Sequence, residues 1–378
     1  MHKAGTYVYL ILVVLFLTSC AVSKKAQIIE QSPLKIENVK ITPDNFNPAS
    51  GKKVNISYQL SKDAKITLNI YDPDMGFITA LATDKLRKKG ANVEVWDGRD
   101  FEGSVVPDQA YFFTIEAEDE LRQKAVYDPT TFSGGEEVDI VDVISDRDAG
   151  TIVFNLPFSA WVLARLGIKN GALMKTLLDW QPCPKGENIV FWNGKDENNL
   201  IALKDHPKFS MMITTMSFPE NSIITRGNSL RCYDEYKRRI ANTRPEKTER
   251  PFTPANANIK LSRHKGQPRW QDRTPRFTIA FPEITETTPE GYPIIKEKAL
   301  LKVILDERDK AYITGQRFEI VLYVDHMLYM EEEEGYTPFT WMWDVCNLSE
   351  GEHLLTINIV SLNDQVGAQS LKFVVKNR

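Results

Sequence analysis

The residues that could do chemistry are sparse in this chain of 378 residues, which has 4 cysteines and 5 histidines. Cys183 and Cys232 could form a disulfide in an oxidising compartment, whereas Cys346 lies in an alternating run and is expected to be a small buried residue. His353 begins an alternating strand, where it is expected to pack at the sheet edge rather than act as a base. The sequence contains none of the short motifs of zinc proteases, serine hydrolases, P-loop enzymes or zinc-binding Cys-x-x-Cys pairs. We therefore predict a protein that is not an enzyme and needs no cofactor.

One group of carboxylates could hold a cation. Asp139, Asp142, Asp146 and Asp148 lie close together in the stretch that spans residues 134–150. Carboxylate oxygens are the ligands that Ca²⁺ prefers, but the Asp-x-Asp-x-Asp-Gly pattern of a calcium loop is absent. A solvated acidic linker without a metal is therefore the leading interpretation, and a junction stiffened by calcium is the alternative.

The N-terminus carries a targeting signal. Lys3 precedes the apolar residues 7–17, a run shorter than the roughly 20 residues of a membrane-spanning helix but typical of the apolar part of a signal peptide. The sequence Leu17-Thr18-Ser19-Cys20 follows directly and resembles the lipobox of bacterial lipoproteins. That resemblance implies cleavage before Cys20 and attachment of acyl chains to Cys20; a plain secretory signal is the alternative. In the same family, Ala21 at the next position implies transport to the outer membrane, on a side that the sequence leaves open.

An internal repeat organises the first two thirds of the chain. Apolar and polar residues alternate in short runs separated by turn residues, which is typical of the strands of an antiparallel sandwich. The run 56–60 (ISYQL) corresponds to 152–156 (IVFNL), and the run 96–100 (WDGRD) corresponds to 192–196 (WNGKD), in each case 96 residues later. This period exceeds the length of about 20–50 residues found in solenoid repeats, so it indicates two tandem domains.

The first repeat resembles the immunoglobulin-like domain of flagellar hook-capping proteins, the FlgD type. The resemblance rests on the run 43–48 (PDNFNP) together with the run 96–100, and it covers roughly residues 38–118. It implies a β-sandwich that serves as a structural adaptor, although the second repeat lacks the NFNP run. In the run 96–100 the aromatic residue closes the core, Asp97 starts a turn and Gly98 takes the left-handed conformation. We therefore predict that this run is a folding turn rather than a binding site.

Residues 225–276 form the most basic stretch of the chain, with 14 Lys and Arg against 5 Asp and Glu. The spacing of apolar residues predicts a short helix over 229–241, and the remainder is predicted to be an extended linker. Anionic headgroups, acidic glycans or an acidic face of the protein itself, such as the carboxylate run 331–334, could bind this stretch. We expect no nucleic-acid partner, because the chain is exported, its formal net charge is −4 and Trp270 is an isolated aromatic residue.

The C-terminal region is a third β-rich part. Within it, the segment 341–359 resembles Ig-like and cadherin-like modules of bacterial surface proteins. With 42% hydrophobic residues, the chain can build packed cores. We therefore predict an all-β protein of three tandem immunoglobulin-like β-sandwiches. Its parts are a signal peptide (1–19), the lipidated cysteine and a tether (20–37), a FlgD-like domain (38–133), a second repeat with an acidic linker (134–224), a basic linker (225–275) and a C-terminal domain (276–378).

These features favour a non-enzymatic lipoprotein of the cell envelope, attached to the membrane through Cys20, that acts as a scaffold or adaptor for other envelope proteins. The alternative is a carbohydrate-binding envelope lipoprotein. In that case exposed aromatic side chains would bind the glycan, and the candidates are Trp161, Trp180, Trp270 and Trp341. The sequence does not identify the partner, because an adaptor domain implies no particular ligand.

Overall fold

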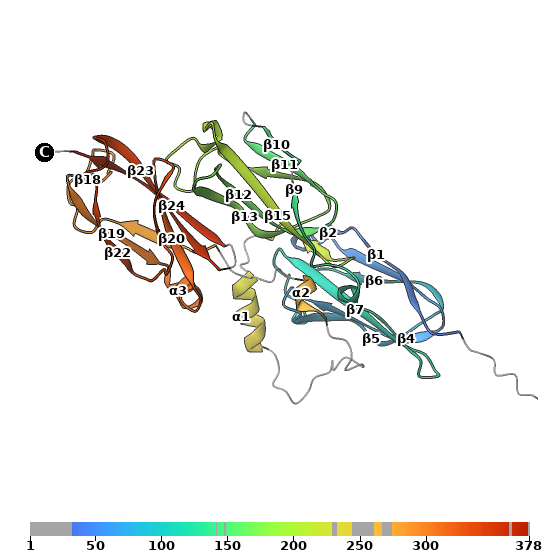
Figure 1. Ribbon diagram of the computed structural model, residues 1–378. Coiled ribbons are helices and arrows are strands. Elements are labelled where there is room, and N and C mark those ends of the chain that lie inside the picture. Colours follow the sequence, from blue (N-terminus) through green and yellow to red (C-terminus); the bar gives the residue numbers. More distant parts are fainter. Residues whose placement is uncertain are drawn as a thin grey trace, which may run out of the picture. The chain divides into compact units, whose positions relative to one another are not determined.

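The computed structural model describes residues 32–140, 142–146, 149–228, 233–243, 261–266, 274–362 and 365–376 (Figure 1). The predicted signal peptide, Cys20 and most of the tether lie outside these residues. Within the compact unit Leu34–Arg378, the strands form three sandwiches of two sheets each. The chain is therefore all-β with tandem immunoglobulin-like sandwiches, as the sequence predicted. No helix in the described part of the chain combines the length and the apolar character needed to cross a membrane.

The first sandwich packs a three-stranded sheet, in the order β1-β3-β6, against a six-stranded sheet in the order β2-β16-β7-β4-β5, with β8 beside β7. Strand β16 reaches this sheet from beyond the second sandwich and pairs parallel with β2 and antiparallel with β7. The strands are β1 (Ile36–Thr42), β2 (Asn45–Phe46), β3 (Val54–Leu60), β4 (Ala64–Tyr71), β5 (Phe77–Arg87), β6 (Gly90–Trp96), β7 (Ala110–Glu118), β8 (Lys124–Tyr127) and β16 (Ile223–Thr225), and short 3-10 helices lie at η1 (Pro48–Ser50) and η2 (Pro129–Thr131).

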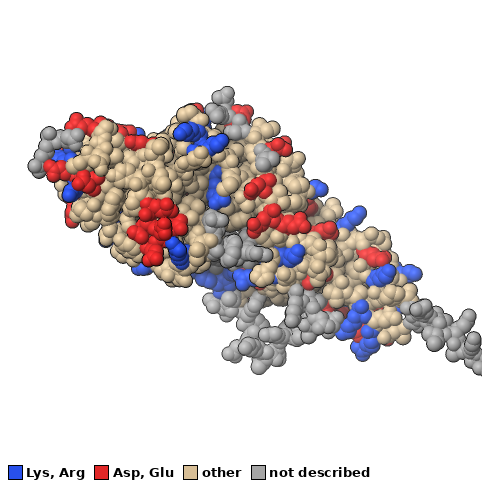
Figure 2. Space-filling view, in the orientation of Figure 1, with Lys and Arg blue, Asp and Glu red and all other residues tan. Residues whose placement is uncertain are grey.

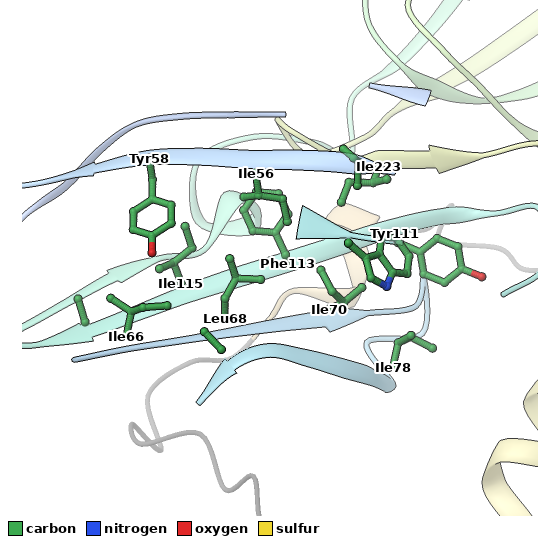
Figure 3. Packing of buried hydrophobic residues seen from close by; sticks show 14 of the residues in the cluster. Ile56, Tyr58, Ile66, Leu68, Ile70, Ile78, Tyr111, Phe113, Ile115 and Ile223 are labelled. Atoms are coloured by element: carbon green, nitrogen blue, oxygen red, sulfur yellow. The ribbon is translucent and has the colours of Figure 1, made fainter. Parts of the chain in front are cut away.

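The core of the first sandwich follows from the alternation of its strands. Every second residue of β3 is buried, and Ile56 and Tyr58 point toward Ile66 and Leu68 of β4 and toward Ile115 of β7 (Figure 3). Period-two patterning places these apolar side chains on the one face that is turned away from water. The sequence pattern therefore predicted the inward face of these strands correctly.

The second sandwich repeats this design. A sheet in the order β10-β11-β14 packs against one in the order β13-β12-β15-β9. Its strands are β9 (Glu137–Ile140), β10 (Val143–Asp146), β11 (Thr151–Leu156), β12 (Ala160–Ile168), β13 (Leu173–Cys183), β14 (Gly186–Phe191) and β15 (Phe209–Ser217), and η3 (Leu203–Asp205) precedes β15. Strands β12 and β13 begin 96 residues after β4 and β5, so the sequence repeat is a repeat of structure.

The turn after β6 in the first sandwich is the same as the turn after β14 in the second sandwich. Trp96 Nε1 donates to the Arg99 carbonyl at 2.9 Å, and Trp192 Nε1 donates to the Lys195 carbonyl at 2.8 Å. Trp96 is buried edge-on against the ring of Tyr111 at 5.2 Å. The run 96–100 is therefore a folding turn, as predicted.

The third sandwich packs the sheet β17-β19-β22 against the sheet β18-β24-β23-β20-β21, around a core that includes Trp343 and Phe373. Its elements are β17 (Phe277–Ala280), β18 (Ile294–Ile295), β19 (Lys298–Leu305), α3 (Glu307–Ile313), β20 (Phe318–Val324), β21 (Met327–Glu332), β22 (Phe339–Asp344), β23 (Gly351–Ser361) and β24 (Val366–Val375). Helix α3 begins after Asp306, whose side chain accepts a hydrogen bond from the Arg308 amide at 2.9 Å.

The basic stretch contains two helices, α1 (Tyr233–Thr243) and α2 (Arg263–Gly266). Helix α1 lies where the sequence predicted a helix over 229–241. Tyr236 and Ile240 of α1 belong to the core of the first sandwich. Part of the stretch predicted to be a linker is therefore packed against a folded domain.

Candidate functional site

The outer face of the three-stranded sheet in the second sandwich exposes apolar side chains. Ile144 of β10 pairs with Val153 of β11, and Val153 pairs with Ile189 of β14, so the three side chains form one row across the sheet. Ile144 is 70% exposed and Ile189 is 54% exposed. Phe191, two residues further along β14 on the same face, is 78% exposed. We call Ile144, Val153, Ile189 and Phe191 the apolar patch.

The first sandwich is an internal comparison for this patch. Val93 and Val95 of β6 occupy the positions of Ile189 and Phe191 in the repeat and are also exposed. In the middle strand, however, Ser57 of β3 stands where the second sandwich has Val153. The fold therefore tolerates a polar side chain at this position, and folding does not require the continuous apolar row of the second sandwich. Single exposed apolar residues are common on protein surfaces, whereas a contiguous apolar patch is typical of an interaction site.

Carboxylates lie around the apolar patch. Asp146 pairs with Thr151, which in turn pairs with Phe191, so all three face the same side of the sheet. Glu187 lies two residues before Ile189 on that face, and Asp142 is exposed just before β10. Strands β10, β11 and β14 contain no Lys or Arg. Within the described part of the chain, β14 is the last strand of its sheet, so no further strand covers its outer edge. The surface thus has an apolar centre and an acidic rim.

A second charged surface of the protein is covered by its own basic stretch. The Tyr236 hydroxyl donates to Asp100 Oδ2 at 3.2 Å, and Arg239 Nη2 donates to the same oxygen at 2.8 Å. Burial, together with the nearby Asp100 carboxylate, raises the pKa of Tyr236, so this hydroxyl stays a donor. Arg239 also forms an ion pair with Glu102.

Asp74 extends this acidic surface. Its carboxylate forms ion pairs with Lys237 of α1 and with Arg263 of α2, the latter at 2.9 Å. The described helices of the basic stretch therefore bind the acidic face of the first sandwich. The carboxylate run 331–334, the other acidic face considered for this role, instead includes Glu333, which pairs with Arg317 at 3.5 Å. Figure 2 accordingly shows basic and acidic side chains interspersed on the visible face rather than a field of one sign.

The tryptophans proposed for glycan binding are not free aromatic platforms. Trp161 is buried, and its Nε1 donates to the Gly266 carbonyl at 2.9 Å, so it lacks the exposure that the glycan alternative requires of it. Trp180 packs against the same apolar cluster and is half-buried. Trp341 stacks on Trp343 with 5.8 Å between the rings, and Trp270 lies outside the described residues. Of the three candidates that the structure describes, Trp161 is therefore unavailable to a glycan, and Trp180 and Trp341 are partly covered by neighbouring side chains.

The cysteines and the histidine considered as reactive residues differ in their exposure to solvent. Cys183 is a buried free thiol, and burial raises its pKa to about 11, while Cys232 lies outside the described residues. Cys346 is exposed, so the prediction that it is buried was wrong; the strand ends at Asp344, and the Cys346 amide bonds to that side chain at 3.0 Å. His353 is buried between the Asp325 carboxylate at 2.6 Å and the Ser349 carbonyl at 2.8 Å. This histidine packs as predicted.

The carboxylates considered for calcium do not converge. Asp139 accepts a hydrogen bond from the Thr214 hydroxyl, and Asp146 accepts one from the Ala149 amide, each at 2.9 Å. Asp142 is exposed, and Asp148 lies outside the described residues. In the residues that the structure covers, no group of three or more His, Cys, Asp or Glu side chains is arranged to hold a metal ion.

Sequence reasoning missed the apolar patch. The run Ile189-Val190-Phe191 was a usable signal, because three consecutive apolar residues in a sandwich strand place apolar side chains on both faces. Val190 faces the core, so its two neighbours must face outward. The acidic face of the first sandwich carried no comparable signal, because Asp74 and Asp100 belong to ordinary turns.

No protein-family model matches this chain, and no curated protein matches it. Among solved structures, it is similar to an endo-β-1,4-mannanase from Thermotoga petrophila (12% identity, TM-score 0.21), with 49% of this chain and 29% of the mannanase covered. It is also similar to a 1.5-MDa bacterial ice-binding adhesin (12% identity, TM-score 0.19; 92% of this chain and 100% of that chain). A third match is the dimeric latent PorU from Porphyromonas gingivalis (9% identity, TM-score 0.20; 92% and 34%). At these TM-scores the likenesses identify neither a relative nor a function, and the chain spans less than a third of the mannanase.

Proposed function

We propose that this protein is a non-enzymatic adaptor of the bacterial cell envelope, which is held on the outer membrane by lipid on Cys20 and binds another envelope protein through the apolar patch. The observation that supports binding is the row of exposed Ile144, half-buried Val153 and exposed Ile189, beside exposed Phe191. At the equivalent place, the first sandwich has Ser57 in the middle of the row.

The energetics favour a covered patch. Burying a large apolar side chain contributes about 1.5–3 kcal/mol relative to leaving it in water. A few residues carry most of the energy in a protein interface, and Phe191 is the large aromatic side chain of this patch that could act as such an anchor. A specific interface of standard size buries about 1,600 Å² in total, so a partner would also contact the polar residues around the patch.

The anchor is supported by the order of the N-terminal features, an apolar run followed directly by Leu17-Thr18-Ser19-Cys20. Several acyl chains, at about 0.8 kcal/mol for each buried methylene, would hold the protein firmly on a bilayer. We expect Cys20→Ser to abolish metabolic labelling with an alkyne fatty acid and to release the protein from the membrane fraction. Labelling that survives this substitution would disprove the anchor.

The adaptor role is tested by crosslinking of the full-length protein in its native envelope. We expect Phe191→Asp to remove a specific crosslinked adduct, because a carboxylate in place of the most exposed ring of the patch cannot be desolvated cheaply. The matched control is Met327→Asp, which changes an equally exposed apolar residue of the third sandwich. Adducts that are identical in the unaltered protein and in Phe191→Asp would count against this function.

A further inference from the structure

We infer that the partner of the apolar patch presents apolar side chains flanked by Lys or Arg. This inference rests on the proposed function and adds the chemistry of the partner. It is carried by the rim of the patch, where Asp142, Asp146 and Glu187 surround the apolar row. The three strands that build the surface contribute no basic residue.

The rim lies close enough to the patch to act on the same partner. Residues two apart on a strand share a face and are separated by about 6.5–7 Å. Glu187 is two residues from Ile189 on β14, and Asp146 is two residues from Ile144 on β10, whereas Asp142 is exposed just before β10. A partner side chain that contacts Ile144 or Ile189 therefore lies next to a carboxylate of this protein. A neighbouring residue of the partner can reach that carboxylate.

Other occupants fit this surface less well. A second copy of the chain, packed face to face, would bring the acidic rims together, and like charges across an interface are unfavourable. A bilayer surface of anionic lipids would repel the same carboxylates. Three cations of the basic stretch, Lys237, Arg239 and Arg263, are paired with Asp74, Asp100 and Glu102 of the first sandwich, and Arg276 is paired with Asp309. Charge complementarity therefore favours a separate protein with a basic rim.

The test places a photoreactive group in the patch of the full-length lipidated protein. Phe191→p-benzoylphenylalanine keeps an aromatic ring at this position, and the same substitution at Met327 is the control. Crosslinking is carried out in the native envelope, and the crosslinked peptides are identified by mass spectrometry. The same experiment is repeated with Asp142→Lys and Glu187→Lys together, and with Asp142→Asn and Glu187→Gln as the uncharged, similarly shaped pair.

We expect an adduct at position 191 that is absent at position 327, with Lys or Arg in the partner segment. The charge-reversed pair should lower the yield about tenfold, the uncharged pair should lower it less, and added salt should lower it in the unaltered protein. An adduct whose yield ignores charge reversal, or whose partner segment lacks basic residues, overturns the basic partner but leaves the adaptor function standing. Adducts between two copies of the chain, or with its own residues 244–260, also overturn it. Adducts with lipid only, or none above the control, overturn the adaptor function itself.

Discussion

Helix α1 is attached to the first sandwich through Asp100, and this attachment can be measured. The Asp100 carboxylate accepts four described hydrogen bonds: Oδ1 accepts the amides of Glu102 and Ser104, and Oδ2 accepts the Tyr236 hydroxyl and the Arg239 guanidinium. Asp100→Asn keeps an oxygen for the two turn amides. It replaces the second oxygen with an amide nitrogen, which cannot accept a hydrogen bond from the guanidinium. The substitution therefore weakens the helix contact and spares the turn.

The size of the effect follows from burial. A hydrogen bond to a charged group contributes about 1.5–3 kcal/mol, but the Arg239 side chain is 36% exposed, so water screens part of the interaction. We expect a loss of about 1–2 kcal/mol, which is about a five- to thirtyfold change in an equilibrium constant. Hydrogen exchange reports such local opening directly, so the amides of residues 233–243 should exchange faster by this factor.

The second sandwich supplies the matched control. Asp196 is the repeat equivalent of Asp100, and its Oδ1 accepts the amides of Leu200 and Ile201. Asp196→Asn should leave exchange in α1 unchanged, because none of its described hydrogen bonds reaches that helix. If exchange in α1 is equally slow in the unaltered protein and in Asp100→Asn, the ion pair does not hold the helix and the reasoning fails.

Three further predictions concern the cores. Trp96→Ala and Trp192→Ala should each lower the free energy of unfolding of their sandwich by about 3–5 kcal/mol in chemical denaturation, and a loss below about 1 kcal/mol would mean that the ring is not part of the core. At pH 8 a maleimide should modify exposed Cys346 well before buried Cys183, whose thiol has a pKa raised to about 11, as peptide mapping by mass spectrometry can check. The pKa of His353 is raised above its ordinary value of about 6.5: burial opposes the charge, but hydrogen bonds to a backbone carbonyl and a carboxylate outweigh it. Its contribution to stability is therefore complete below pH 6.5 and is lost as the pH rises through the raised pKa, so an NMR titration midpoint at or below 6.5 would contradict the assignment.

The sequence predicted those parts of the fold that depend on interactions between residues close in the chain. Alternation in β3 and β4, together with the turn at Trp96, predicts strands, inward faces and strand ends, and the repeat transfers the prediction to the second sandwich. The position of β16 was not predictable in this way. Ile224 and Thr225 of β16 pair with Asn45 and Phe46 across more than a hundred intervening residues, and no local pattern encodes such a pairing. Cys346 was predicted to be buried because the alternating pattern of the sequence continues through it. The strand in fact ends at Asp344, so the pattern does not apply at Cys346.

The candidate site was partly hidden for a related reason. A patch depends on which strands are neighbours, and the row of Ile144, Val153 and Ile189 comes from three strands whose register is fixed only in the folded sheet. The sequence does record the excess of apolar residues in β14. It does not record that β10 places Ile144 at the other end of the row.

The distribution of charge links the two surfaces. The basic stretch is an obvious internal ligand for acidic surfaces of the same chain. Its excess of positive charge offsets acidic residues elsewhere, so that the whole chain has a net charge of only −4. Lys237, Arg239 and Arg263 of this stretch instead pair with Asp74, Asp100 and Glu102, and Tyr236 and Ile240 bury α1 in the core of the first sandwich. Moving α1 to the second sandwich would expose those apolar residues and leave the carboxylate of Asp100 buried without its cation, a combination that costs far more than a surface ion pair returns. In the described part of the chain, helices α1 and α2 therefore cover the acidic face of the first sandwich, and the ion pairs of Lys237, Arg239 and Arg263 do not reach the rim of the apolar patch.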